Sequence, residues 1–166
     1  MHIRLAVAVL LLPVVACSSG TDQSAPDYGP RVSVYHADSG STVLLAGISG
    51  LRSRANLVVT DADTWAQVWA EAQAPYQPQE PAPGIDFGED GVIVAALGTS
   101  PSGGYAIAID SIEFFASGQR VHLTRTSPAT SCVSISVITN PVHMVRVPRP
   151  LDQVSFVENA RVRDCP

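Results

Sequence analysis

Lysine is missing from the 166-residue sequence, so all ten basic residues are arginine. Fifteen acidic residues outnumber them, and the formal net charge is −5 at pH 7. Short arginine pairs occur at positions 52 and 54 and at positions 161 and 163, but no stretch of the chain forms a basic face. Proteins that bind a phosphate backbone need such a face, so nucleic-acid binding is not expected.

Apolar runs long enough to span a bilayer, about twenty residues, are also missing. The longest run, Leu5–Val15, has about eleven residues and follows Arg4, as in the apolar core of an export signal. It leads into Val14-Val15-Ala16-Cys17, which resembles a bacterial lipobox. We therefore expect residues 1–17 to be a lipoprotein signal peptide and Cys17 to carry palmitate or similar chains. An ordinary cleaved signal, with an incidental Cys17, is the alternative.

The residue after Cys17 is serine rather than aspartate, and nothing there suggests retention at an inner membrane. We expect a lipid-anchored protein of the cell envelope, on the outer membrane and facing the periplasm if the cell is Gram-negative. Residues 18–30 lack apolar periodicity and are expected to form a flexible tether. Residues 31–166 have the length of a single domain.

Cysteine is scarce, and only Cys132 and Cys165 remain once Cys17 is acylated. An even pair in an oxidising compartment favours a disulfide that closes a loop of about 33 residues. In the chain-entropy model, such a crosslink stabilises a fold by about 3–4 kcal/mol. The alternatives are two unrelated thiols or metal ligands. Because no histidine stands at ligand-type spacing from either cysteine, neither a metal nor another cofactor is expected.

Signatures of catalysis are missing as well. The chain has no P-loop, no dinucleotide fingerprint and no H-E-x-x-H motif. Ser102 lacks the preceding glycine of a nucleophile elbow. Asp110, His122 and Ser134 form a triad only on paper, since each stands in a strand pattern without a local signature. We therefore expect a protein that is not an enzyme.

Helical periodicity occurs once. Four apolar residues fall at positions i, i+3, i+4 and i+7 of one helical face: Trp65, Val68, Trp69 and Ala72. Asp61 or a near neighbour is the expected amino-terminal cap and Pro75 the expected stop, at the start of a proline-rich loop through Gly84. Packing of the tryptophans on a sheet is the simpler interpretation, and a ligand platform is the alternative.

The rest of the chain has the pattern of strands. The candidate segments are residues 31–36, 42–48, 56–60, 92–97, 105–115, 120–126, 133–137, 142–147 and 153–163. Residues 92–97 are continuously apolar, as in a strand buried on both faces. In residues 133–137 valine and isoleucine alternate with serine, the clearest period-2 segment of the chain. One early helix and many strands predict an α+β domain, with the helix packed on a mainly antiparallel, curled or barrel-like sheet.

Several segments resemble, in this order, the PrcB C-terminal domain family. They are Phe87, Val92-Ile93-Val94-Ala95-Ala96-Leu97-Gly98, Pro101-Ser102-Gly103-Gly104-Tyr105, Cys132, Asn140-Pro141 and Val145-Arg146-Val147-Pro148. The helix with Trp65 and Trp69 is similar to the helix that precedes these segments in the family, so the resemblance covers residues 56–148. It implies an exported accessory subunit that stabilises a surface protease complex, with another protein, a protease among the candidates, as its partner.

The loop Pro101–Tyr105 is the most specific part of this resemblance. Its glycines, Gly103 and Gly104, permit a close backbone approach, and the Tyr105 ring is of a type common at binding hot spots. A structural turn with Tyr105 packed inward is the alternative. The same loop resembles the P-T-T-G-Y loop of chagasin-type cysteine-protease inhibitors, although Ile107 stands where those have tryptophan. A sheet closed around an apolar cavity would indicate a small-ligand carrier instead.

The lipobox yields the first prediction. Cys17→Ser is expected to abolish fatty-acid labelling, because the thiol is the acceptor of the acyl chains. The wild-type protein should fractionate with membranes and the variant should not, as measured by metabolic labelling and fractionation of the envelope. Unlabelled, soluble wild-type protein in the periplasm or medium would rule out acylation.

Overall fold

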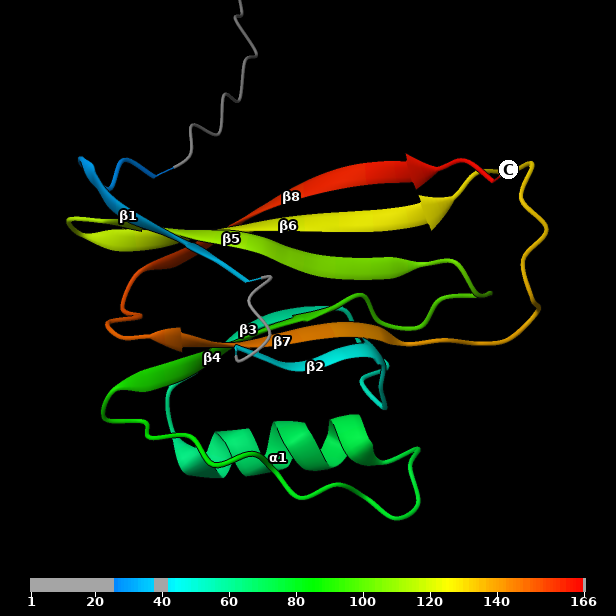
Figure 1. The fold of residues 1–166 in the computed structure, drawn as a ribbon, viewed down its shortest axis with the longest axis horizontal. Coiled ribbons are helices and arrows are strands. Elements are labelled where there is room, and N and C mark those ends of the chain that lie inside the picture. The colour runs from blue at the N-terminus through cyan, green and yellow to red at the C-terminus, as the bar shows by residue number, and fades with distance from the viewer. Residues whose placement is uncertain (1–25, 38–41, 166) are drawn as a thin grey trace, which may run out of the picture.

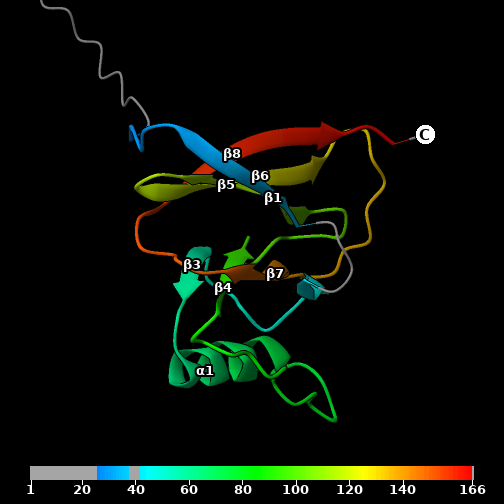
Figure 2. The same cartoon turned by 60° about the vertical axis from the view of Figure 1, so that its left-hand side comes forward.

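The computed structural model describes residues 26–37 and 42–165, so the expected signal, Cys17 and the first part of the tether lie outside the described residues. The described chain forms eight strands and one helix in three layers (Figure 1). Sheet I has the order β1-β5-β6-β8, and sheet II has the order β2-β7-β4-β3. The two sheets stack face to face, and the helix covers the outer face of sheet II (Figure 2).

The strands of the two sheets differ in length. Those of sheet I are β1 (Arg31–His36), β5 (Ala106–Phe115), β6 (Gly118–Pro128) and β8 (Val154–Arg163). Those of sheet II are β2 (Val43–Ile48), β7 (Pro141–Pro148), β4 (Asp90–Ala96) and β3 (Ala55–Val59). Within these sheets only β6 and β8 run parallel, with Gln119 opposite Val154 and Pro128 opposite Arg163. The α+β class and the mainly antiparallel pairing are confirmed, but the barrel is wrong, because two separate sheets form instead.

Strand β4 explains why the fold has three layers. Its five apolar residues 92–96 are at most 1% exposed. Val92, Val94 and Ala96 face the helix, whereas Ile93 and Ala95 face sheet I, since successive side chains point to opposite faces of a strand. A strand that is apolar on both faces must be covered on both, and full burial of one such side chain stabilises the fold by about 1.5–3 kcal/mol.

Helix α1 (Ala62–Gln73) begins and ends as its sequence predicts. The Asp61 side chain accepts a hydrogen bond from the Thr64 N–H at 2.8 Å, and this bond lowers the pKa of the Asp61 carboxyl. Trp65 and Trp69 are buried against sheet II. Their indole N–H groups donate to carbonyl oxygens of the proline-rich loop, at 3.0 Å to Pro83 and 2.8 Å to Glu80. The tryptophans therefore pack in the core and hold this loop against the helix.

Two side chains of β1 and β7 join the sheets by hydrogen bonds. The Tyr35 hydroxyl donates to the Arg146 carbonyl at 3.0 Å, from sheet I to sheet II. The His143 side chain reaches from sheet II to sheet I, where its Nδ1 accepts the Ile109 N–H at 2.9 Å, next to the register shift of β5 with β6 between Ile109 and Ser111. The bulge frees this N–H from the ladder, so the imidazole supplies its partner.

The strand expected over residues 133–137 is wrong. These residues lie in the connection between β6 and β7, and they pair with no other strand in the part of the chain that the structure describes. Val133 is 101% exposed and Ile135 is 73% exposed. The alternation is real, but alternation alone does not supply a neighbouring strand with which these residues could pair.

The domain includes a residue that the sequence assigns to the tether. Tyr28 is 8% exposed and packs on Phe115 with ring centroids 5.9 Å apart. Its carbonyl accepts the Ser117 hydroxyl at 3.0 Å, in the hairpin between β5 and β6. The chain is therefore fixed to sheet I from Tyr28 onward, before the first strand.

His143 makes stability depend on pH. Burial lowers the pKa of His143, with Asp110 opposing, and the neutral ring is the form that accepts the Ile109 N–H. The unfolded chain binds a proton near pH 6.5, so this stability is complete above about pH 6.5 and is lost as pH falls through the lowered folded pKa. We expect His143→Asn, which keeps an acceptor but does not titrate, to flatten the dependence.

Urea unfolding of both proteins over a pH series measures this effect. The lowered pKa of Glu113 also costs stability in acid, but only below the ordinary carboxyl value near 4.5, so the two contributions separate. An identical slope for both proteins just below pH 6.5 would contradict the assignment to His143.

Candidate functional site

Three connections meet at the end of the sandwich that carries the carboxyl terminus (Figure 1). We call this the loop end, formed by residues 49–54, 98–105 and 129–140. The Thr99 N–H donates to the Arg52 carbonyl at 3.0 Å, and the Ser49 N–H donates to the Asn140 carbonyl at 2.9 Å. All three connections are thereby tied to one another by backbone hydrogen bonds.

The predicted binding loop, Pro101–Tyr105, packs along the 129–140 connection. Ser100 and Thr139 form a two-bond bridge, with N–O distances of 2.8 and 3.1 Å. The Gly103 N–H donates to the Ile135 carbonyl at 3.1 Å, and the Thr139 hydroxyl donates to the Ser102 carbonyl at the same distance. The two segments therefore present one joint surface.

The two glycines of this loop allow the close approach. A Cβ atom on Gly103 would lie 2.9 Å from Ile135 Cγ1, and one on Gly104 would lie 3.3 Å from Pro128 Cβ. Gly104 also has φ of +89°, which favours glycine. Pro101 is exposed, whereas Tyr105 is half-buried, so its ring both contacts the fold and reaches the surface. The loop therefore combines features of both alternatives: a binding loop that exposes Tyr105 and a structural turn that packs Tyr105 inward.

The 129–140 connection carries four of the nine large apolar residues that are exposed in the described chain. Its exposed apolar side chains are Val133 at 101%, Ile135 at 73%, Ile138 at 70% and Val137 at 45%. Ile138 also lines a cleft of about 740 Å³ beside the end of α1, together with Arg52 and Pro75. Periodicity and motifs did not predict this exposed surface, but the sequence does carry one signal of it. No Asp, Glu, Lys or Arg occurs between Arg125 and Arg146.

A disulfide holds one end of this connection. Cys132 is bonded to Cys165, with Cα atoms 5.4 Å apart, and the Ala129 N–H donates to the Arg163 carbonyl at 3.0 Å. The expected pairing of the two cysteines is thus present. It joins the start of the exposed apolar segment to the residues that follow β8.

Three described arginines without an ion pair lie at the same end, near two carboxylates that also lack one: Glu71, in the cleft with Arg52, and Asp164, next to Arg163. Five of the nine arginines after Arg4 pair with carboxylates, and Arg149 donates to two carbonyls. Among residues 26–37 and 42–165, Arg52, Arg161 and Arg163 have neither an ion pair nor a side-chain hydrogen bond. Arg52 lies in the connection before β3 and lines the cleft with Ile138, while the other two lie at the end of β8, which leads to the disulfide-bonded Cys165.

The residues considered for a triad have other partners. His122 Nε2 lies 2.9 Å from Glu113, whose second partner is Arg31. The hydrogen bond from His122, followed by that from Arg31, lowers the pKa of the Glu113 carboxyl. Asp110 accepts the Thr124 hydroxyl at 2.7 Å.

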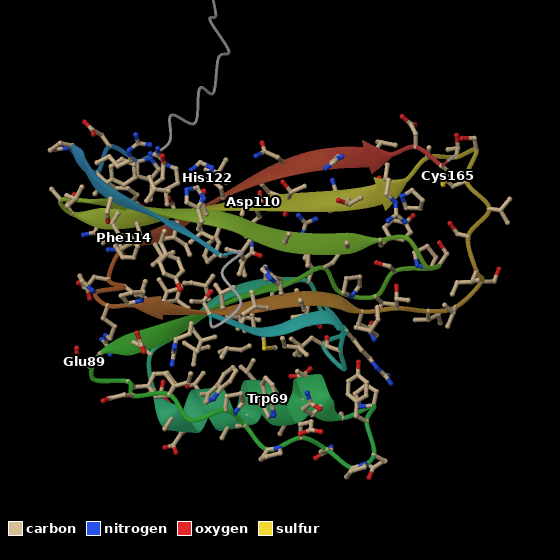
Figure 3. All side chains as sticks on the ribbon, in the orientation of Figure 1. Trp69, Glu89, Asp110, Phe114, His122 and Cys165 are labelled. Atoms are coloured by element: carbon tan, nitrogen blue, oxygen red, sulfur yellow. A yellow bond between two sulfur atoms is a disulfide. The ribbon has the colours of Figure 1, made fainter. Side chains whose placement is uncertain are left out.

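Figure 3 places His122 and Asp110 on sheet I, while Ser134 belongs to the loop end. Ser102 donates to the neighbouring Gly103 carbonyl at 3.1 Å. Within the described ranges no three His, Cys, Asp or Glu side chains form a group that could hold a metal ion. The helix in these ranges is too short to cross a membrane.

The architecture defines an α+β protein with one helix on a two-sheet sandwich. Residues 92–148 match the family described as PrcB C-terminal, which confirms the resemblance over this part of the chain. The match runs from β4 to the end of β7 and includes Pro101–Tyr105 and the 129–140 connection. The helix with the two tryptophans lies outside the matched residues. No curated protein and no solved structure matches the chain.

The crosslink of Cys132 and Cys165 yields a prediction about the surface that it holds. Replacing both cysteines with serine is expected to lower the free energy of unfolding by about 3–4 kcal/mol, since a loop of 33 residues is released. Hydrogen exchange of residues 130–138 should also become faster, because one end of the segment is then free. Thiol titration of denatured, unreduced protein is the control, and two free thiols would contradict the bond.

Proposed function

We propose that this chain is a non-catalytic, lipid-anchored accessory protein of the cell envelope, and that its loop end binds another protein. Its partner is a protease or a subunit of a protease complex, as the match to the PrcB C-terminal family suggests. The observation that carries the proposal is the joint surface of Pro101–Tyr105 and the 129–140 connection. This surface is apolar, uncharged and fixed in shape by backbone hydrogen bonds and a disulfide.

The composition of the loop end supports binding of a protein. Interfaces combine an apolar centre, depleted of charge, with a rim in which arginine is common. Here Val133, Ile135 and Ile138 supply the exposed apolar centre, and Arg161 and Arg163 supply part of the rim. A soluble protein gains nothing from exposing such side chains next to one another, so their exposure supports a contact.

A second function, inhibition of a cysteine protease, is favoured by one observation. The Pro101–Tyr105 loop lies at one end of a β-sandwich beside two other connections, an arrangement suited to filling a cleft in a protease. Ile107 is buried in the core between the sheets, at the position where the chagasin-type pattern has tryptophan. The stabilising role is therefore the better supported of the two.

A carrier of small ligands is less well supported. The space between the sheets is filled by side chains from both, with Ile93, Val145 and Val147 packed against Ile112 and Leu123. An apolar ligand would need that space, because ligand sites bury most of the ligand in an apolar cavity.

Tyr105 provides the test of the proposal. Tyr105→Ala is expected to weaken capture of the envelope partner by about 2 kcal/mol, as truncation of a hot-spot aromatic does. It should lower the free energy of unfolding by only about 1 kcal/mol, because the ring is half-buried. Partner capture is measured after crosslinking in the native envelope, and stability is measured by thermal unfolding.

Two variants serve as controls. Tyr35→Ala removes another half-buried tyrosine, on β1, and should reduce stability without affecting capture. Ser102→Ala should change neither quantity, and a loss of hydrolytic activity in this variant would reveal a nucleophile instead. If folded Tyr105→Ala protein captures its partner as well as the wild type does, the loop is a structural turn.

A further inference from the structure

The segment Val133–Ser136 has the sequence of a strand but no strand beside it. Alternating β-branched and small polar residues are typical of a strand with one covered face. In the described chain, however, the segment lies outside both sheets and ends in a tight turn at Ser136, where the Val137 N–H donates to the Ile135 carbonyl at 2.9 Å. Val133 and Ile135, whose side chains such a strand would cover, are 101% and 73% exposed.

The backbone of this segment offers free hydrogen-bonding groups. In the part of the chain that the structure describes, the N–H groups of residues 133–136 have no hydrogen-bond partner. The Ile135 carbonyl accepts from Gly103, so this edge of the segment faces the Pro101–Tyr105 loop. In a trans peptide the N–H points opposite to the preceding carbonyl, so the Ser136 N–H faces away from the loop that the Ile135 carbonyl contacts. The backbone groups of Ser134 face the same way where the chain is extended at Ile135.

We propose that Val133–Ser136 is a docking edge to which an extended segment of the partner protein adds as a further β-strand. Addition of a strand satisfies the free main-chain groups, and pockets for alternate side chains then give specificity. The docking edge rests on the proposed function, since it specifies how the loop end binds a protein. It assigns the outward backbone groups of Ser134 and Ser136 to pairing, and Val133 and Ile135 to side-chain contacts.

The charges around the docking edge define the chemistry of the added segment. The edge itself is uncharged, and near it the described chain has three arginines without an ion pair, Arg52, Arg161 and Arg163, against two such carboxylates, Glu71 and Asp164. Opposite charges across an interface favour the correct partner and exclude others. The added segment therefore has apolar residues at alternate positions and acidic residues at its ends.

A peptide of this composition tests the inference on the full chain in mild detergent. The probe is an acetylated peptide, Glu-Asp-(Val-Thr)₃-Asp-Glu, and binding is measured by fluorescence anisotropy. We expect the probe to bind and to slow hydrogen exchange at the amides of Ser134 and Ser136. The backbone N–H groups of alternate residues in the bound probe point to the same edge, so one of the two alternating sets pairs with the docking edge. N-methylation of that set should abolish binding, and N-methylation of the other set should not.

Two matched substitutions separate the edge from general apolar contact. Ile135→Ser is expected to weaken binding of the probe about tenfold or more. Val32→Ser is its control, because Val32 is exposed to the same 73% but lies on β1, away from the loop end. Replacement of Arg161 and Arg163 by glutamate should weaken binding of the acidic probe and strengthen binding of a version with lysine at both ends.

Other results would overturn the docking edge. Failure of the wild-type chain to bind the probe, or equal effects of Ile135→Ser and Val32→Ser, would do so. Self-association or binding to phospholipid vesicles that Ile135→Ser abolishes would assign the edge to a second copy or to lipid. If Tyr105→Ala loses the envelope partner and Ile135→Ser retains it, the proposed function stands and strand addition fails. If Ile135→Ser loses the envelope partner and Tyr105→Ala retains it, strand addition is supported and the Pro101–Tyr105 loop is not part of the binding site.

Discussion

Burial of β4 on both faces is the constraint on which the rest of the structure depends. One strand supplies Ile93 to the core between the sheets and Val94 to the core beneath the helix, so neither layer can move without disturbing the other. The chain leaves this strand at Leu97 and Gly98 and runs directly into the Pro101–Tyr105 loop. The loop therefore takes its direction from the most rigidly packed element of the fold, and binding sites of proteins are commonly carried by loops on such a scaffold.

Local patterns predicted most elements and failed where partners are distant in sequence. The helix followed from its periodicity, from Asp61 and from Pro75, and the burial of β4 followed from its unbroken apolar run. Pairing of β6 with β8 crosses the whole 129–140 connection and β7, and no local pattern records a parallel register of that kind. The strand expected at 133–137 failed for the same reason: alternation gives the faces of a segment but not the availability of a neighbour.

The candidate site was predictable only in part. The glycines of Pro101–Tyr105 indicated a tight loop, and the family resemblance singled it out. The surface beside the loop depends on which arginines form ion pairs and on which apolar side chains stay exposed to solvent. Tertiary packing determines both. Glu113 and Glu158 each pair with two arginines, whereas Arg52, Arg161 and Arg163 have no ion pair among the described residues. Charge counts along the sequence do not contain this information.

If Cys17 carries lipid, as proposed, the attachment of Tyr28 at the β5–β6 hairpin limits the distance of the domain from the bilayer. Cys17 precedes Pro26 by nine residues, a stretch that spans at most about 30 Å. With Cys17 acylated, the hairpin stays within that distance of the lipid headgroups, while strands of ten and eleven residues carry the loop end roughly 35 Å further along the long axis. In that arrangement, the proposed anchor and the proposed contact surface are separated by the full length of the sandwich. A large partner can be held in the aqueous space without being drawn against the membrane, and the number of residues before Tyr28 sets how far out it sits.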